Sequence, residues 1–546
     1  MELKQEIEKI IDGDVSIDEN DISSHSMDAS IFVMRPKIVV YPKNTKDIEN
    51  LVNFVKEKKK EDSSLSITGR SAGTDMSGGT ITDSISLDFT RFINKVINID
   101  ENDMSAVIEP GVYFRDFEKL ADQKHLLYPA YPASKNLCAL GGMLANNSGG
   151  EKSLNFGKTE KYIEKLNVVL TDGKEHTFEK IDKTTLDKKM KEPNFEGEIY
   201  QKMYDLMDKN YDLIKSSKPQ VSKISSGYNI WNVWDKNVFD LSQIFIGSQG
   251  TLGMITQAKL RLIKERDKRG LVILFLENFD HLPDIINEVL EFEPESFESF
   301  DNYTFKLALK FIFQFSKLLG KKAISMPFEF LPEFLLVLKE RKLPKLVLLV
   351  EFNEDNIEKV EEKVNKLMEH VKKYNNLYSR VAKNETDIEK YFAIRRESFN
   401  LLRGKIKNLK AAPFIDDIIV QPKFLPEFLP RLYDILNDEK LIYTVAGHMG
   451  DGNFHIIPLM DLEKQEEKDR IFKIADRVYS LVLEYKGIFS AEHNDGLIRS
   501  PYLKMEYGDQ IYEIFKQVKE IFDKDNIFNP YKKIGTTKEF SSKYII

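Results

Sequence analysis

The first half of the chain alternates short strand-like runs with amphipathic and glycine-containing segments. Within residues 35–60, a β-branched run ends in a turn and an amphipathic helix follows. Strand-like segments flank a Gly/Ser/Thr loop within residues 64–89, and further along a β-hairpin is predicted with its turn at Asp172-Gly173. Up to about Leu262 the pattern therefore predicts an α+β fold with many glycine-containing loops.

A charged segment from Lys264 to Arg269, of the kind that separates domains, precedes a different pattern. Two strand–helix–strand blocks follow, the first over residues 271–292 and 346–374 and the second over residues 413–487. Apolar strands separated by helices of this length predict an antiparallel sheet with helices on one face, of the split βαβ type.

The length of 546 residues is too great for one ordinary hydrophobic core, so two or three packed units are expected. The patterns divide the chain into residues 1–266, residues 267–500 and a C-terminal segment, 501–546, which we expect to pack back on the first part.

Composition narrows the class of protein. With 42% hydrophobic and 31% charged residues the chain is globular, and a net charge of −8 with interspersed acids and bases argues against a nucleic-acid-binding surface. The single cysteine, Cys138, excludes intrachain disulfides and a Cys-ligated Fe–S cluster in this chain. Because the sequence has neither an apolar run of 18 residues nor a signal or transit pattern at its start, we expect a cytoplasmic protein with at most peripheral membrane contact.

Glycine is concentrated in three loops of the first half: GRSAGTDMSGG (69–79), LGGMLANNSGG (140–150) and GSQGTLGMIT (247–256). Glycine lets backbone N–H groups turn inward and bind an anion without any cation. The first loop has neither GxGxxG spacing nor a following GK[ST], which excludes the Rossmann and P-loop motifs. Three such loops together indicate one large polyanionic ligand.

A histidine cluster is the strongest sign of chemistry. Three of the eight histidines lie in one 46-residue stretch, in GHMGDGNFH (447–455) and SAEHNDG (490–496). A Gly-Asp-Gly turn separates His448 from His455, so we expect the two rings to lie at the ends of adjacent strands. With Glu492 they form a candidate site for Zn²⁺, Fe²⁺ or Mn²⁺, and a structural polar cluster is the alternative.

These motifs resemble a known family when they are taken together. The loop 69–79, LGGMLANNSGG, KISSGYNIW and GSQGTLGMIT resemble, in this order, the FAD-binding domain of the vanillyl-alcohol-oxidase type. The continuation through GHMGDGNFH and SAEHNDGLIRSP to IFNPYKKIG is similar to the FAD-linked 2-hydroxy-acid dehydrogenases, which include D-lactate, glycolate and D-2-hydroxyglutarate dehydrogenases. The resemblance runs from about Asp28 to Gly535 and implies a two-part FAD-binding domain over 1–266 and a ferredoxin-like antiparallel-sheet substrate (cap) domain over 267–500.

The resemblance implies FAD with its pyrophosphate at the loop 69–79. A covalent flavin link is not expected, because no histidine lies in or immediately beside this loop; His125 is the nearest. Cys138 is expected to be a buried residue near the flavin. The implied cofactor-binding residues are Gly69, Arg70, Ser71, Gly73, Thr74, Gly78, Gly79, Gly142, Asn147, Ser148, Gly149, Gly247, Gly250, Thr251 and Gly253.

The resemblance also implies the roles of the histidine cluster. The family's matching residues for His448, His455 and Glu492 hold a divalent metal, and the histidine that matches His493 accepts a proton. The metal, with Zn²⁺ as first choice and Fe²⁺ or Mn²⁺ as alternatives, would bind the substrate's 2-hydroxyl and one carboxylate oxygen. His493 would take the hydroxyl proton while the C2 hydrogen leaves as hydride to the flavin.

Three further side chains are candidates for contact with the substrate. A substrate carboxylate needs a cation, and Arg395, in a segment that matches the family's carboxylate-binding arginine, is our choice, with Arg499 second. Asn453 lies two residues before His455 and is assigned to donate to the substrate, with a role as a turn former weighted equally.

Two positions depart from the family pattern. Asn494 replaces a glycine; asparagine tolerates the positive φ that a glycine suggests, but its amide is expected to intrude near His493 and alter substrate choice. Some D-2-hydroxyglutarate enzymes have a lysine where this chain has Ile415, Asp416 and Asp417, which weakens that assignment. The sequence looks closer to the long members that are fused to an Fe–S domain.

The sequence is therefore interpreted as an FAD- and metal-dependent dehydrogenase that oxidises a D-2-hydroxy acid. Without an NAD motif, the expected acceptor is a quinone, an electron-transfer flavoprotein, a cytochrome or a separate Fe–S subunit, and a homodimer is an open option. The Phe-rich segment 305–338 is a candidate docking face, with a buried helical layer as the preferred alternative. Rival functions are an electron-transfer subunit with a degenerate site, an oxidase that reduces O₂, and a non-flavin metallohydrolase.

Overall fold

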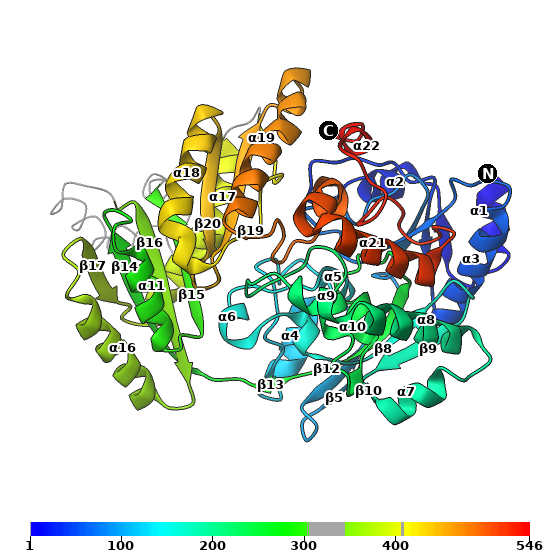
Figure 1. The fold of residues 1–546 in the computed structure, drawn as a ribbon, viewed down its shortest axis with the longest axis horizontal. Helices are drawn as coiled ribbons and strands as arrows, with labels where there is room; N and C mark the ends of the chain where they lie inside the picture. Colours follow the sequence, from blue (N-terminus) through cyan, green and yellow to red (C-terminus); the bar gives the residue numbers. More distant parts are fainter. Residues whose placement is uncertain (1, 303, 305–343, 406–408) are drawn as a thin grey trace.

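The structure is a computed structural model that describes residues 2–302, 304, 344–405 and 409–546, with the backbone alone for 397–405. The Phe-rich segment 305–338 lies outside the described residues. Figure 1 shows two bodies, with the sheet of the second half on one side and the N-terminal and C-terminal elements together on the other.

The N-terminal body contains two sheets. The first has four strands in the order β1-β2-β4-β3, in which β2, β3 and β4 run parallel and β1 pairs antiparallel with β2. Its strands are β1 (Asp14–Ser16), β2 (Ile38–Tyr41), β3 (Ile67–Arg70) and β4 (Ile85–Asp88), and its helices are α1 (Glu2–Glu8), α2 (Glu19–His25) and α3 (Thr45–Lys58). The predicted β-branched run and amphipathic helix are thus β2 and α3, and Asn44 caps the helix by accepting from the backbone N–H of Asp47.

The second sheet has five antiparallel strands in the order β5-β6-β12-β8-β9. They are β5 (Val96–Asp100), β6 (Ser105–Ile108), β8 (Ile163–Val169), β9 (Glu175–Glu179) and β12 (Met254–Arg261). Two short pairs, β7 (Leu126–Leu127) with β13 (Ile263–Lys264) and β10 (Ile181–Asp182) with β11 (Val238–Phe239), complete this part. The hairpin predicted at Asp172-Gly173 joins β8 to β9, and the φ of +70° at Gly173 supports the turn.

Helices close this sheet into a core of its own. Side chains of α4 (Phe114–Asp122), α8 (Phe195–Lys209) and α10 (Ser242–Phe245) meet those of β6, β8 and β12 in one cluster. The smaller helices of this half are α5 (Leu140–Asn146), α6 (Ser153–Phe156), α7 (Lys183–Lys189) and α9 (Tyr211–Ser216).

The second half forms an antiparallel sheet in the order β17-β14-β16-β15-β20-β21-β18, with β19 also paired to β21. Its strands are β14 (Lys268–Leu276), β15 (Ser296–Asp301), β16 (Leu346–Glu354), β17 (Leu377–Val381), β18 (Lys410–Ala411), β19 (Ile418–Ile419), β20 (Ile442–His448) and β21 (Asn453–Met460). The predicted antiparallel sheet is present.

Helices cover both faces of this sheet, so the expectation of helices on one face was wrong. Alternate residues of β14 divide between two clusters, with Val272 on one face and Ile273 on the other. The first face packs against α11 (Leu282–Glu291), α16 (Ile357–Val371), α18 (Leu425–Asp438) and α19 (Gln465–Glu484). The other face packs against α17 (Glu385–Lys405), which requires β14 to be apolar on both sides.

The C-terminal segment returns to the N-terminal body (Figure 1). It contains α20 (Gly496–Arg499), α21 (Leu503–Asp523) and α22 (Lys538–Ser542), and α21 contributes Phe515 and Phe522 to the core around α8. Phe528 then forms a parallel bridge with Ile67, at the edge strand β3.

Candidate functional site

One cavity of about 1260 Å³ contacts both halves of the molecule. Its walls include the glycine loops of the N-terminal body, the arginines of α17 and the histidines of β20 and β21. Glycine backbone and imidazole rings therefore border the same cavity, whose volume suits a large ligand together with a small one.

Most of the predicted cofactor-binding residues line this cavity. They are Gly69, Arg70, Ser71, Gly73, Thr74, Gly79, Gly142, Ser148, Gly149, Gly250 and Gly253. Gly73 has a φ of +65°, and a Cβ there would overlap the guanidinium of Arg70. A Cβ at Gly250 would meet nothing within 4 Å, because the backbone at that position borders open space. This glycine-lined wall fits a dinucleotide whose phosphates approach the main chain.

Four predicted residues do not line the cavity: Gly78, Asn147, Gly247 and Thr251. The side chain of Asn147 donates to Glu160 at 2.6 Å and accepts from its backbone N–H at 3.0 Å. Thr251 bonds Ser248 and the hydroxyl of Tyr228. These side chains hold the loops in place, and spacing alone could not separate them from loop residues that face the cavity.

The strand positions of His448 and His455 follow from the hairpin between β20 and β21. A 3₁₀ turn, Met449–Asp451, and Gly452 at φ +71° connect the two strands. In the strand register His455 lies opposite Ala446. The ring centroids of His448 and His455 lie 5.2 Å apart. The predicted convergence of the two histidines is present.

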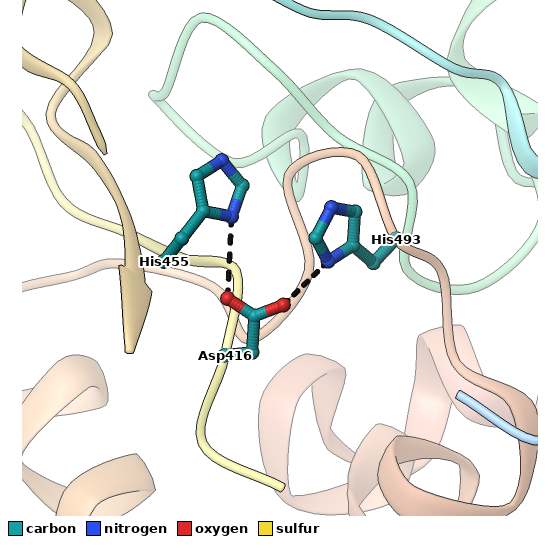
Figure 2. Close-up of side chains that lie close together, drawn as sticks. All are labelled: Asp416, His455 and His493. Atoms are coloured by element: carbon teal, nitrogen blue, oxygen red, sulfur yellow. Dashed lines mark hydrogen bonds and ion pairs between the residues drawn. The ribbon is translucent and has the colours of Figure 1, made fainter. Parts of the chain in front are cut away.

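A carboxylate contacts the Nδ1 atom of each histidine in this cluster. Nδ1 of His448 donates to Oε1 of Glu298 at 2.7 Å. Asp416 accepts from Nδ1 of His455 at 3.2 Å and from Nδ1 of His493 at 2.6 Å, one ring on each oxygen (Figure 2). Such bonds fix the tautomer that leaves Nε2 free to bind a metal or accept a proton.

Two groups of three side chains are close enough to hold one metal ion. His448, His455 and Glu492 form one group, and Asp416, His455 and His493 form the other, with the donor atoms of each group within 4.8 Å of one another. In the second group the Nδ1 atoms already bond Asp416, whereas in the first Nε2 of His448 faces Oε1 of Glu492 at 3.3 Å, the two atoms that would share an ion. The donor set of the first group, two imidazoles and a carboxylate, therefore fits a divalent metal better.

Lys223 is a buried cation inside this cluster, and the sequence analysis missed it. Its Nζ forms ion pairs with Glu492 and, at 3.0 Å, with Asp451. Only 1% of the Lys223 side chain is exposed. Burial favours a higher pKa for Glu492, but the charge of Lys223 outweighs it and holds that pKa well below its usual range. Glu492 is therefore an anion in the fold.

The histidines have different proton affinities. Burial lowers the pKa of His455, while the negative charge of Asp416 opposes it in part. Burial also acts to lower the pKa of His493, but the adjacent Asp416 and Asp417 carboxylates outweigh it and raise the pKa to about 9. Because Nδ1 bonds Asp416, Nε2 is the atom that exchanges a proton, and it must lose its own proton before it can accept one, which a divalent cation bound nearby would favour.

Arg395 and Arg396 of α17 both line the cavity, with different partners. Arg395 Nη2 forms an ion pair with Oε2 of Glu298 at 2.5 Å, whereas its Nε has no hydrogen-bond acceptor among the described residues. Arg396 donates two hydrogen bonds of 2.6 Å to Glu151, one from Nε and one from Nη2, so this edge of its guanidinium is occupied by a bidentate pair. Arg395 therefore stays the candidate for contact with a substrate carboxylate, and Arg396 has its donors occupied.

The alternative arginine, Arg499, lies in the fold away from the cavity wall. It is fully buried and donates to the backbone carbonyl oxygens of Asn494 and Asp416, both at 2.8 Å. It positions the chain on either side of the cluster.

Asn453 is also bound into the framework. Its amide donates to Asp417 at 3.3 Å and to the backbone oxygen of Ile418 at 3.2 Å, so both donors already have acceptors. Asp417 in turn accepts from the backbone N–H groups of Glu492 and His493, at 2.9 and 2.7 Å. These bonds favour a positioning role for Asn453 over the predicted donation to the substrate.

Asn494 has the positive φ that was predicted, +67°, but its side chain points elsewhere. The amide donates to the backbone oxygen of Gly247 at 2.8 Å and accepts from Nζ of Lys533 at 2.7 Å. The expectation that it would intrude near His493 was wrong, because the αL backbone turns the amide toward the glycine loops.

Cys138 lines the cavity and is 4% exposed, in agreement with a buried residue near the cofactor site. Burial raises the pKa of its thiol to about 12, so it is held as the neutral thiol. His125 is not among the residues that line the cavity.

Glu298 and Asp416 are the other residues that the sequence analysis missed. In the sequence, Asp416 stands out only because some relatives have a lysine in this stretch. Glu298 lies about 150 positions before His448, in a segment without a motif. The alternation of β15 places Glu298 opposite His448 in the sheet, a neighbour that only the strand order reveals.

Among the helices that the structure describes, none combines the length and the apolar character needed to cross a membrane.

Two family models match the chain. The model described as "FAD binding domain" matches residues 36–179, and that described as "FAD linked oxidases, C-terminal domain" matches residues 266–533.

Curated relatives match over most of the chain. D-2-hydroxyglutarate dehydrogenase of Pseudomonas putida is 26% identical over 526 residues, which cover 95% of this chain and 50% of that protein. The chain thus spans about half the length of this relative. Glycolate oxidase subunit GlcD of Bacillus subtilis is 25% identical, covering 91% of this chain and 88% of its own. D-lactate dehydrogenase of Anaerostipes hadrus is 25% identical, covering 91% and 89%.

Solved structures show the fold. p-Cresol methylhydroxylase superposes with a TM-score of 0.69 at 13% identity over 98% of this chain and 97% of its own. 4-Ethylphenol oxidase from Gulosibacter chungangensis gives 0.66 at 13% identity, also over 98% and 97%. The fold is α+β of the vanillyl-alcohol-oxidase type. The resemblance seen in the sequence is therefore confirmed, and the chain combines an FAD binding domain with the C-terminal domain of the FAD linked oxidases.

Proposed function

We propose that the chain is an FAD- and metal-dependent dehydrogenase that oxidises a D-2-hydroxy acid to the 2-oxo acid. The observation that carries this proposal is the single cavity that contacts both the glycine loops and the cluster of His448, His455, Glu492 and His493. The names of the relatives, D-2-hydroxyglutarate and D-lactate dehydrogenases, support the substrate class.

The residues have distinct tasks in this proposal. His448, His455 and Glu492 would hold the metal, which when bound would lower the pKa of the substrate's hydroxyl. Arg395 would orient the substrate through its carboxylate, with Nε as the donor that lacks an acceptor among the described residues.

The proton and the hydride would go to different acceptors. His493 accepts the hydroxyl proton on Nε2, while Asp416 stabilises the imidazolium through Nδ1. The glycine loops would hold FAD, which would supply the acceptor for the C2 hydride. We assign a non-NAD electron acceptor, because the chain has no dinucleotide motif of the NAD type.

The structure gives no support to the rival in which Asn494 disables the site. Its amide bonds Gly247 and Lys533, and the contacts of His493 with Asp416 are intact. We therefore assign catalysis to the chain itself.

The test uses the purified holoprotein. Anaerobic addition of D-2-hydroxy acids should bleach the flavin absorbance, L-enantiomers should not, and turnover with a dye acceptor should be lost in EDTA and restored by Zn²⁺, Fe²⁺ or Mn²⁺. Flavin that no hydroxy acid reduces would refute the dehydrogenase. Steady peroxide production in air would favour the oxidase, and colourless protein the metallohydrolase.

A further inference from the structure

The cavity wall beside the histidines is apolar. In the hairpin of β20 and β21, Ala446 lies opposite His455 and Thr444 opposite Ile457, so these four side chains share one face of the sheet. All four line the cavity. Their strand neighbours point the other way, and Val445 and Ile456 belong to the core under the helices. The wall therefore continues outward from His455 as a surface of alkyl groups and one hydroxyl.

Two more elements add small or apolar residues to the same space. Ala393 lies two positions before Arg395 on α17 and lines the cavity. Ala411 of β18 also lines it, and it pairs with Leu459, two residues beyond Ile457 on the same face of β21. The alanines leave room beside the cation that we assign to the substrate carboxylate.

Two charged side chains of α17 that line this space, Arg396 and Glu389, do not suit a second carboxylate. Arg396 already makes two hydrogen bonds with Glu151. The Glu389 carboxylate, another group on the cavity lining, lies 3.7 Å from Arg396 and adds negative charge. Arg396 therefore offers a distal carboxylate no free donor in exchange for its lost water.

Lys410 also lines the cavity, and it is exposed at the start of β18, where its strand position sets the direction of its side chain. It pairs with Met460, whose side chain lies in the same core as Val445 and Ile456, on the face of the sheet opposite to His455. Because paired residues project to the same face, the Lys410 side chain leaves the sheet opposite to His455 and Ile457.

On the basis of the function proposed above, we propose that the substrate is a 2-hydroxy acid with an aliphatic side chain, and that Ala446, Ile457 and Ala393 form its side-chain subsite. Each methylene that enters an apolar pocket raises specificity by roughly 10- to 200-fold, so the subsite favours larger alkyl groups over a methyl group or a distal carboxylate.

The test compares kcat/KM of the holoenzyme for D-2-hydroxyisocaproate, D-lactate, glycolate and D-2-hydroxyglutarate. We expect D-2-hydroxyisocaproate to exceed D-2-hydroxyglutarate by at least about tenfold. Equal or reversed ranking overturns the inference while the proposed function stands. If neither these acids nor any other hydroxy acid reduces the flavin, the proposed function is overturned instead.

A variant pair checks the subsite itself. Ile457→Arg places a cation on the wall and should reverse the ranking toward D-2-hydroxyglutarate, while Ile457→Met keeps an apolar side chain and should leave the ranking as in the wild type. Flavin absorbance and melting temperature establish that both variants fold. An unchanged ranking in folded Ile457→Arg places the side-chain subsite elsewhere and overturns the assignment.

Discussion

Asp416 accepts a hydrogen bond of 2.6 Å from Nδ1 of His493 through Oδ2, while its other oxygen contacts His455. Asp416 is fully buried, so water does not compete with the two histidines for its oxygens. One carboxylate thus orients the proposed proton acceptor and a proposed metal ligand together.

Replacing this carboxylate should disturb both roles. In Asp416→Asn the amide can accept from one ring only, and its NH₂ group opposes the N–H of the other. We expect kcat to fall by about 10- to 100-fold and metal affinity to fall by a similar factor. Steady-state kinetics and metal analysis of the purified variant measure the two effects.

The control for this variant is Asp469→Asn on the exposed side of α19, where the same chemical change should alter neither quantity. Wild-type turnover and metal content in Asp416→Asn would contradict the positioning role.

The buried ion pairs of Lys223 give a second prediction. Lys223→Met leaves Glu492 and Asp451 without their cation, so we expect a loss of about 3–5 kcal/mol in the free energy of unfolding of chelator-treated protein. A divalent metal at Glu492 would replace part of the missing charge, so Zn²⁺ should raise the melting temperature of the variant more than that of the wild type. Denaturant unfolding and thermal melts supply both numbers.

Lys202→Met is the matched control, because Lys202 pairs with Glu198 at 2.5 Å on the surface with 53% of its side chain exposed. It should change the free energy of unfolding by less than about 0.5 kcal/mol. A Zn²⁺ shift that is equal in Lys223→Met and wild type would argue against metal at Glu492.

The sequence allowed the fold and the histidine cluster to be predicted because their signals are local. A turn of Gly-Asp-Gly between two apolar strands determines where His448 and His455 meet, and glycine spacing identifies the loops around the cavity. The partners of the cluster were not predictable in this way. Lys223 and Glu492 are 269 positions apart, and their pairing depends on how the two bodies pack.

The direction of the Asn494 side chain could not be predicted from the sequence either, because it too depends on a residue far away in the chain. Its positive φ could be predicted from the residue type, but the acceptor that it finds, Gly247, comes from a loop 247 positions earlier. Helices on both faces of the second sheet were missed because a strand that is apolar on both sides resembles any other apolar run.

A third prediction concerns the pH dependence of stability. Glu506 of α21 is buried beside Asp495; burial, reinforced by that like charge, raises the pKa of Glu506 from 4.5 to about 8. The folded state therefore binds this proton more tightly than the unfolded state. Its stabilising contribution is complete below pH 4.5 and is lost as the pH rises through about 8.

The side chain of Glu506→Gln cannot titrate. The variant should therefore lose the part of the pH dependence of the unfolding free energy that Glu506 causes, which is at most roughly 1.4 kcal/mol per pH unit. Urea unfolding at several pH values between 4.5 and 9 measures the difference between variant and wild type. Glu520→Gln, exposed on the same helix, is the control and should follow the wild type. Parallel curves for Glu506→Gln and wild type would show that this carboxyl group does not carry the effect.

The last prediction separates a structural from a catalytic role for Asn494. Its side chain bonds Gly247, Lys533 and the backbone N–H of Asp495, and so ties the turn after His493 to a glycine loop and to the C-terminal segment. Asn494→Gly keeps the backbone at φ +67° without strain but removes these bonds. We expect a loss of about 1–3 kcal/mol in the free energy of unfolding, because the buried Lys533 and the carbonyl of Gly247 lose a partner. The order of preference among hydroxy acids should stay the same, since the amide does not line the cavity. Unfolding curves and a substrate panel measured on the same preparation decide the matter: a changed order at unchanged stability would return Asn494 to the substrate site.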